Sequence, residues 1–161
     1  MKALWTAIAI VAALLLETAL SRLLPGGPRV FDPFLLVMVY CALTGGEVHG
    51  MLAGLAAGWV QDVQFGGPVL GLSAFSKILI GYAVGVAGAH FLIAGPAARA
   101  LVLLMGTLGD ALVFQWLAAV FDLRVLDLSP LALASRAAVN AVVGAGLFEL
   151  VDRRLARRFA E

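Results

Sequence analysis

Six polar side chains stand inside otherwise apolar runs of this sequence, and their chemistry is the first question it raises. They are Glu17, Asp62, Lys77, Asp110, Arg136 and Asn140. Carboxylates beside an ammonium or guanidinium group can form buried ion pairs, whereas the same groups around a cavity can hold a polar ligand. Inside a membrane each ionisable group costs at least ~2.5–3.5 kcal/mol, so such residues are paired or functional.

The composition indicates the environment in which these residues lie. Hydrophobic residues make up 63% of the 161 residues and charged residues only 13%, whereas soluble domains are about 45–50% apolar and about 25% charged. A small soluble globule cannot hide so much apolar surface from water. We therefore exclude a free soluble enzyme, a nucleic-acid-binding protein and a disordered tail, and expect an integral membrane protein.

Glycine and proline residues divide the chain into about six apolar helices, because a membrane crossing needs roughly 20 residues. The expected helices cover residues 3–24, 32–43, 47–65, 70–90, 97–121 and 130 onwards. Asp32 and Pro33 are a typical N-cap and first helical residue, although the helix that they begin is short for a crossing. We expect an all-α polytopic membrane protein with a single domain over residues 1–161.

Glycines recur at four-residue spacing beside the polar residues, which places them on shared helix faces. These candidate helix-packing or partner faces contain Gly50, Gly54, Gly58, Gly81, Gly85 and Gly144. Small residues at this spacing let helix backbones approach closely in lipid. Either the faces pack against one another, or a surplus of them receives the transmembrane helix of a partner.

The polar residues allow two interpretations. In the structural one, Asp62 or Asp110 pairs with Lys77 or Arg136 to hold a compact bundle. In the functional one, they line a ligand pocket in the outer half of the membrane or a groove for a partner's helix. Ser73 and Ser76 lie near Lys77, and Ser73 shares a face with it as in a Ser–Lys dyad, but the common hydrolase and nucleotide-binding motifs are missing. We expect no enzyme, no cofactor and no metal site.

Basic residues near the helix ends predict the orientation, because cytoplasmic loops carry more of them. With six crossings one side carries Lys2, Arg99 and four arginines at the C-terminus, against Arg22, Arg29 and Arg124 on the other. This asymmetry places both termini in the cytoplasm.

A short basic C-terminal tail is expected from about residue 152 to residue 161. Its basic residues are Arg153, Arg154, Arg157 and Arg158. The tail either anchors the topology and touches anionic lipid, at roughly 1 kcal/mol per basic residue, or provides a docking site for a cytoplasmic partner.

The middle of the chain carries motifs that, over about residues 32–85, resemble the MreD family of bacterial rod shape-determining proteins. An apolar helix follows Asp32-Pro33, and a glycine-rich helix runs from Gly50 to Asp62. The stretch Gly67-Pro68-Val69-Leu70-Gly71-Leu72 begins the next helix, which contains Ile80-Gly81-Tyr82.

The resemblance implies a non-enzymatic subunit of the bacterial inner membrane that binds MreC in the rod complex, or elongasome. The wider partners that it implies are MreB, RodZ, a SEDS glycosyltransferase and a class B penicillin-binding transpeptidase, which act in peptidoglycan synthesis and cell shape. It also implies a six-helix fold similar to the substrate-binding subunits of energy-coupling-factor transporters. The alternative function is that of such a subunit, which binds a small molecule such as a vitamin.

Overall fold

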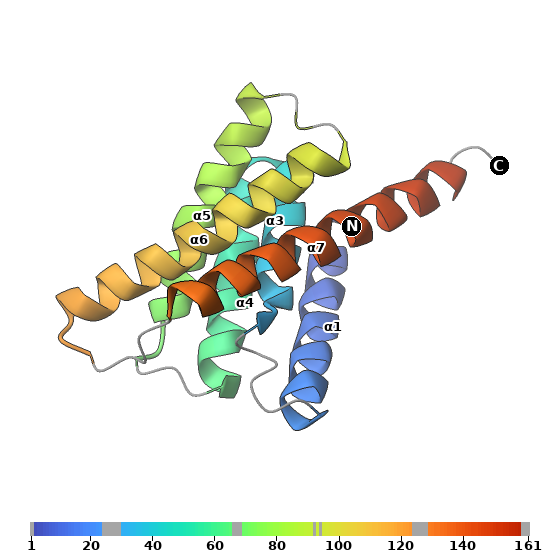
Figure 1. Ribbon diagram of the computed structural model, residues 1–161. Coiled ribbons are helices and arrows are strands. Elements are labelled where there is room, and N and C mark those ends of the chain that lie inside the picture. The colour runs from blue at the N-terminus through green and yellow to red at the C-terminus, as the bar shows by residue number, and fades with distance from the viewer. Residues whose placement is uncertain are drawn as a thin grey trace.

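The computed structural model describes residues 2–23, 30–65, 69–91, 93, 95–123 and 129–158. These residues form six helices (Figure 1). The helices are α1 (Lys2–Leu23), α3 (Pro33–Gly45), α4 (Glu47–Phe65), α5 (Leu72–His90), α6 (Pro96–Val120) and α7 (Pro130–Arg158). The all-α prediction is confirmed, and the expected helix boundaries agree to within about two residues, which is the usual uncertainty of a helix end.

Four of these helices are long and apolar enough to cross a membrane by length and composition, namely α1, α5, α6 and α7. The protein is therefore a polytopic helical membrane protein. Among the other two helices, α3 is apolar but has only 13 residues. The 19-residue helix α4 is more polar, because it carries Glu47, His49, Gln61 and Asp62.

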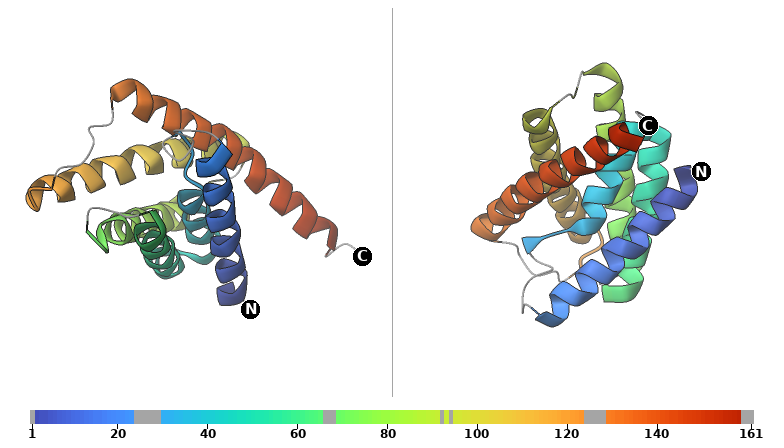
Figure 2. Two further views of the ribbon diagram at one scale, coloured as in Figure 1. Left: turned by 90° about the horizontal axis from the view of Figure 1, so that it is seen from below. Right: turned by 90° about the vertical axis from the view of Figure 1, so that its right-hand side faces the viewer.

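Helix α3 lies at the centre of the bundle, and the other helices surround it (Figures 1 and 2). Helices α1, α4 and α5 run alongside α3, while α6 and α7 form an antiparallel pair that crosses them obliquely. No Cα atom of α1 comes within 8 Å of α7 among the described residues. The side chains of Phe34, Leu35, Met38 and Val39 are fully buried, and α3 supplies more of the buried apolar residues than any other described helix.

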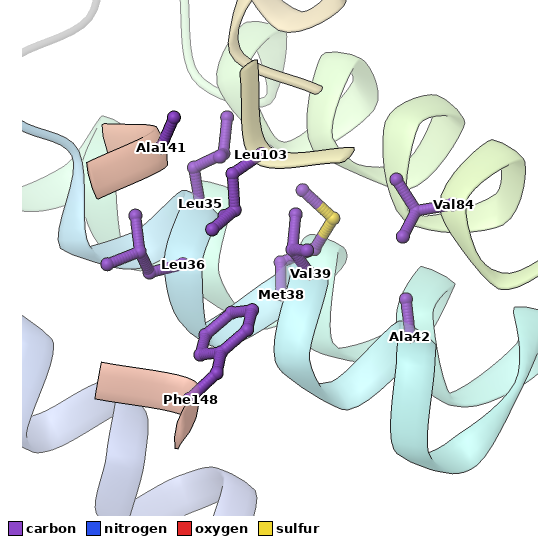
Figure 3. Close-up of a cluster of buried hydrophobic side chains, with 9 residues drawn as sticks. All are labelled: Leu35, Leu36, Met38, Val39, Ala42, Val84, Leu103, Ala141 and Phe148. Carbon is purple, nitrogen blue, oxygen red and sulfur yellow. The ribbon is translucent and has the colours of Figure 1, made fainter. Parts of the chain in front are cut away.

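The main core joins α3 to three later helices (Figure 3). Its buried residues are Leu35, Leu36, Met38, Val39, Ala42, Val84, Leu103, Ala141 and Phe148. Figure 3 shows the α3 side chains pointing toward Leu103 and Phe148. The ring of Phe148 also packs against Tyr40, with ring centroids 5.1 Å apart. Burial of this apolar surface holds α5, α6 and α7 against α3.

The glycine faces are used inside the bundle, chiefly between α4 and α5. A methyl group at Gly54 would overlap the carbonyl of Lys77, and one at Gly50 would overlap that of Gly81. Gly58 faces the backbone of Ala74, and Gly85 faces that of Glu47. The two backbones touch because no side chain separates them.

Gly144 of α7 is likewise covered, because a methyl group there would meet Leu103 and Leu36. All six predicted glycines thus lie at contacts within the protein. The idea that they are a surplus available to a partner's helix is therefore wrong, since neighbouring helices already fill those faces.

Candidate functional site

The start of α3 places a carboxylate inside the bundle. Asp32 is the N-cap of α3, with Pro33 at the first helical position, and its Oδ1 accepts a hydrogen bond from the backbone N–H of Leu35 at 3.0 Å. Asp32 is fully buried, as is Phe34. A helix of 13 residues spans only about 20 Å, so its first turn begins within the bundle and not at its surface.

Asp32 is also the centre of a buried ion-pair network. Its Oδ2 accepts hydrogen bonds from Lys77 Nζ at 3.0 Å and from Arg136 Nη2 at 2.7 Å. Lys77 Nζ donates a further bond to Asp110 Oδ2 at 3.1 Å. Two carboxylates therefore face two cations, contributed by α5, α6, α7 and the cap of α3, and the charges balance.

Neutral side chains complete the network. The hydroxyl of Ser76 donates to Asp110 Oδ1 at 2.7 Å. Asn140 Oδ1 accepts from the backbone N–H of Asp32 at 3.0 Å, and its Nδ2 donates to Thr107 Oγ1 at 3.1 Å. Because a buried polar group without a partner is costly, these bonds fix the relative positions of four helices.

Glu17 brings α1 to the edge of this network. It is only 2% exposed, and it interacts electrostatically with Asp32, Lys77 and Arg136. Within the described part of the chain its Oε2 has no hydrogen-bond partner, and neither does Nε of Arg136. Glu17 therefore lies next to the charge cluster without forming one of its ion pairs.

Asp62 has a different role from the one expected for it. Its carboxylate accepts hydrogen bonds from the backbone N–H groups of Gly71 at 2.8 Å, Ser73 at 3.1 Å and Ala74 at 3.4 Å. It therefore caps the N-terminus of α5, where a negative charge is favourable. Of the ion pairs expected from the sequence, the one between Asp110 and Lys77 is present. Asp62 pairs with neither Lys77 nor Arg136, because its partners are these backbone groups.

The basic tail is the end of α7 and not a separate segment. Helix α7 continues to Arg158, while residues 159–161 lie outside the described residues. The side chains of Arg153 and Arg154 are exposed, and Arg153 Nε bonds Glu149 Oε1 at 3.0 Å. The side chains of Arg157 and Arg158 are not among those described.

The contacts of this site join helices to one another and do not form the Ser–Lys dyad that the sequence suggested. The serine in the network is Ser76, whose hydroxyl bonds Asp110 and not Lys77. Over the described residues no group of three histidine, cysteine, aspartate or glutamate side chains could hold a metal ion. An open groove of about 290 Å³ lies between α5 and α6, and Ile80, Val84 and Met105 are among its apolar lining residues.

Sequence reasoning missed Asp32 as a member of the cluster, although it identified this residue as a helix cap. Two sequence features together contained the signal: the capping aspartate, and a following helix too short to cross the membrane. A short helix that is apolar throughout must begin inside the bundle, which buries its cap. Ser76 was noted near Lys77, but its bond to Asp110 was not foreseen. Thr107 was missed, because a hydroxyl in an apolar helix is too common to single out.

The fold and the site together define a helical membrane protein that holds a network of ion pairs in its interior. The family described as rod shape-determining protein MreD matches residues 2–144, and the chain belongs to this family. Its role is therefore in the determination of rod shape. No curated protein and no solved structure gives a significant match.

Proposed function

We propose that this protein is a non-enzymatic scaffold of the rod complex in the bacterial cytoplasmic membrane, where it binds MreC and supports peptidoglycan synthesis. The observation that carries the proposal is the family match, which extends over residues 2–144. In this proposal the chain crosses the membrane six times, with a fold similar to the substrate-binding subunits of energy-coupling-factor transporters. MreB, RodZ, the SEDS glycosyltransferase and the class B penicillin-binding transpeptidase are the wider partners.

The polar network supports a scaffold role. Lys77 lies between two carboxylates, and Asp32 lies between two cations. Ion pairs that satisfy one another inside a bundle fix its shape, and a rigid shape is what a docking platform requires. The protein then acts through its outward helix faces, since the glycine faces are occupied.

Complementation tests the family role. The host is a rod-shaped bacterium whose own MreD protein has been deleted, so that its cells are round. Expression of this chain should restore the rod shape, as scored by cell length and width. MreC binding is tested separately, by purifying the tagged chain in detergent and measuring the MreC that is recovered. Restored rods without MreC recovery would overturn the MreC proposal and leave the role in rod shape intact.

Site-specific photo-crosslinking tests whether the outward faces bind MreC. The crosslinker is placed at Ile8 of α1, Leu112 of α6 or Val142 of α7, which are 50%, 60% and 74% exposed. The matched control is Ala57, which is fully buried. We expect a crosslink to MreC from at least one outward position and none from Ala57. Crosslinks from Ala57 alone would contradict docking on the outward faces.

The small-molecule alternative receives no support from the family match. Its direct test is the mass spectrum of the protein purified without added ligand, because a binding subunit retains its vitamin. A stoichiometric bound vitamin would replace the scaffold proposal.

A further inference from the structure

The C-terminal part of α7 projects beyond the other helices (Figures 1 and 2). With 29 residues, α7 is about 43 Å long, compared with about 30 Å of hydrocarbon in a bilayer. A set of polar contacts marks where it leaves the bundle. Arg99, in the first turn of α6, forms ion pairs with Glu149 and Asp152, and the hydroxyl of Tyr40 donates to Asp152 at 3.2 Å.

These contacts occupy the acidic residues at this end of α7 and leave arginines beyond them. Arg153 and Arg157 stand four residues apart on one continuous helix, and so do Arg154 and Arg158, so that the members of each pair share a face. The side chain of Arg153 is 71% exposed despite its bond to Glu149. Arg154 is exposed and takes part in no ion pair among the described residues.

An apolar stripe runs along α7 to the same arginines. Val143, Leu147 and Leu150 are 39%, 43% and 59% exposed. With Arg154 they occupy positions i, i+4, i+7 and i+11, which form a single line on a helix surface. A molecule lying along this line would meet apolar side chains first and guanidinium groups at its end.

We propose that this line is a binding site for an anionic phospholipid. The acyl chains lie along Val143, Leu147 and Leu150, and the phosphate is bound by Arg154. Guanidinium groups suit this ligand, because their planar fork donates two parallel hydrogen bonds to a phosphate. The proposal does not rest on MreC binding, since its test needs only the purified chain and lipid.

The position of the arginines suits a lipid headgroup. The polar contacts of Asp152 mark the end of the apolar part of α7, and from Asp152 to Arg158 the helix rises about 9 Å. The headgroup layer on each side of a bilayer is about 5–8 Å deep, which is comparable with that rise.

Lipid selectivity in reconstituted vesicles tests the site. The purified full chain is placed in phosphatidylcholine vesicles, and electron paramagnetic resonance compares the association of spin-labelled phosphatidylglycerol with that of spin-labelled phosphatidylcholine. We expect the wild type to prefer phosphatidylglycerol. Arg154→Gln should lower that preference about fivefold, which corresponds to about 1 kcal/mol per basic residue, and replacing Arg154, Arg157 and Arg158 together by Gln should abolish it.

Two controls separate this site from general charge effects and from misfolding. Arg22→Gln removes one arginine at the opposite end of the bundle and should leave the preference unchanged, while Arg154→Lys should retain most of it. Elution volume and circular dichroism establish that each variant folds. Equal association of both lipids with the wild type would overturn the proposal, and so would a full preference in the triple variant. The proposal would also be overturned if the arginines bound an acidic protein while the chain showed no preference for the anionic lipid.

Discussion

A single carboxylate, that of Asp32, has two tasks in this protein. One oxygen caps α3, and the other accepts hydrogen bonds from Lys77 and Arg136. The cap therefore contributes to the contact between helices as well as to the start of its own helix. Asn140 accepts a hydrogen bond from the backbone N–H of the same residue, so the backbone N–H and both carboxylate oxygens of Asp32 have partners.

A double-mutant cycle tests the coupling at this residue. Asp32→Asn can keep the cap but removes the charge, while Lys77→Met removes the ammonium group. Each single change should lower the free energy of unfolding by roughly 3–5 kcal/mol, because it leaves a charge unpaired in the interior. The double variant should lose less than the sum, by about 0.5–3 kcal/mol. Unfolding by a denaturing detergent in micelles measures all three.

The matched control for this cycle is Arg153→Gln, which breaks an exposed pair with Glu149. An exposed helical pair at this spacing contributes only about 0.3–0.5 kcal/mol, so the control should unfold almost as the wild type does. Strict additivity of the Asp32 and Lys77 changes would contradict a coupled network.

Sequence alone identified most residues of the network, because an ionisable group in an apolar run is rare. Glu17, Lys77, Asp110, Arg136 and Asn140 were found in this way. The pair between Asp110 and Lys77 was among the possible pairs that the sequence offered, but the choice among them could not be derived, since it depends on how the helices cross and rotate. Asp62 shows the limit: its carboxylate binds backbone N–H groups of the next helix, and spacing did not distinguish that role from an ion pair.

At the scale of the element, α4 and α5 form the closest pair of helices. Their glycines let the two backbones touch at Gly50, Gly54 and Gly58. The four-residue spacing indicated these faces, but spacing does not reveal what covers a face. Only the packed structure shows that the neighbouring helix of the same chain does so.

A pair of glycine substitutions tests this packing. Gly54→Leu should separate α4 from α5, because its side chain would overlap the carbonyl of Lys77. We expect a loss of several kcal/mol, as in other cases of overpacking, with a lower midpoint of thermal unfolding in detergent. Gly146→Leu is the control, since a Cβ atom there meets nothing within 4 Å. Equal midpoints for the two variants would contradict a close α4–α5 contact.

At the scale of the whole molecule, successive helices run in opposite directions, and the start of α1 lies on the same side of the bundle as the end of α7 (Figures 1 and 2). The helix count was predictable because glycine and proline punctuate the sequence clearly. The oblique crossing of α6 and α7 was not predictable, because it depends on how their surfaces fit against α3 and α5.

Reporter fusions test the expected orientation. Green fluorescent protein is fluorescent in the cytoplasm, whereas alkaline phosphatase is active only outside it. With six crossings and both termini inside, fluorescent fusions are expected at residues 1 and 161. An active phosphatase fusion is expected in the segment between α4 and α5. An active phosphatase at either terminus would contradict this orientation.

The ion pair between Asp32 and Arg136 spans 104 residues of sequence, and this separation has a consequence for biogenesis. At roughly 5–20 residues per second, the ribosome needs about 5–20 s to make Arg136 after Asp32. During that interval the growing chain contains Asp32, Lys77 and Asp110, which are two carboxylates and one cation. The last helix therefore completes the charge balance, and a chain released before α7 carries an uncompensated carboxylate in its interior.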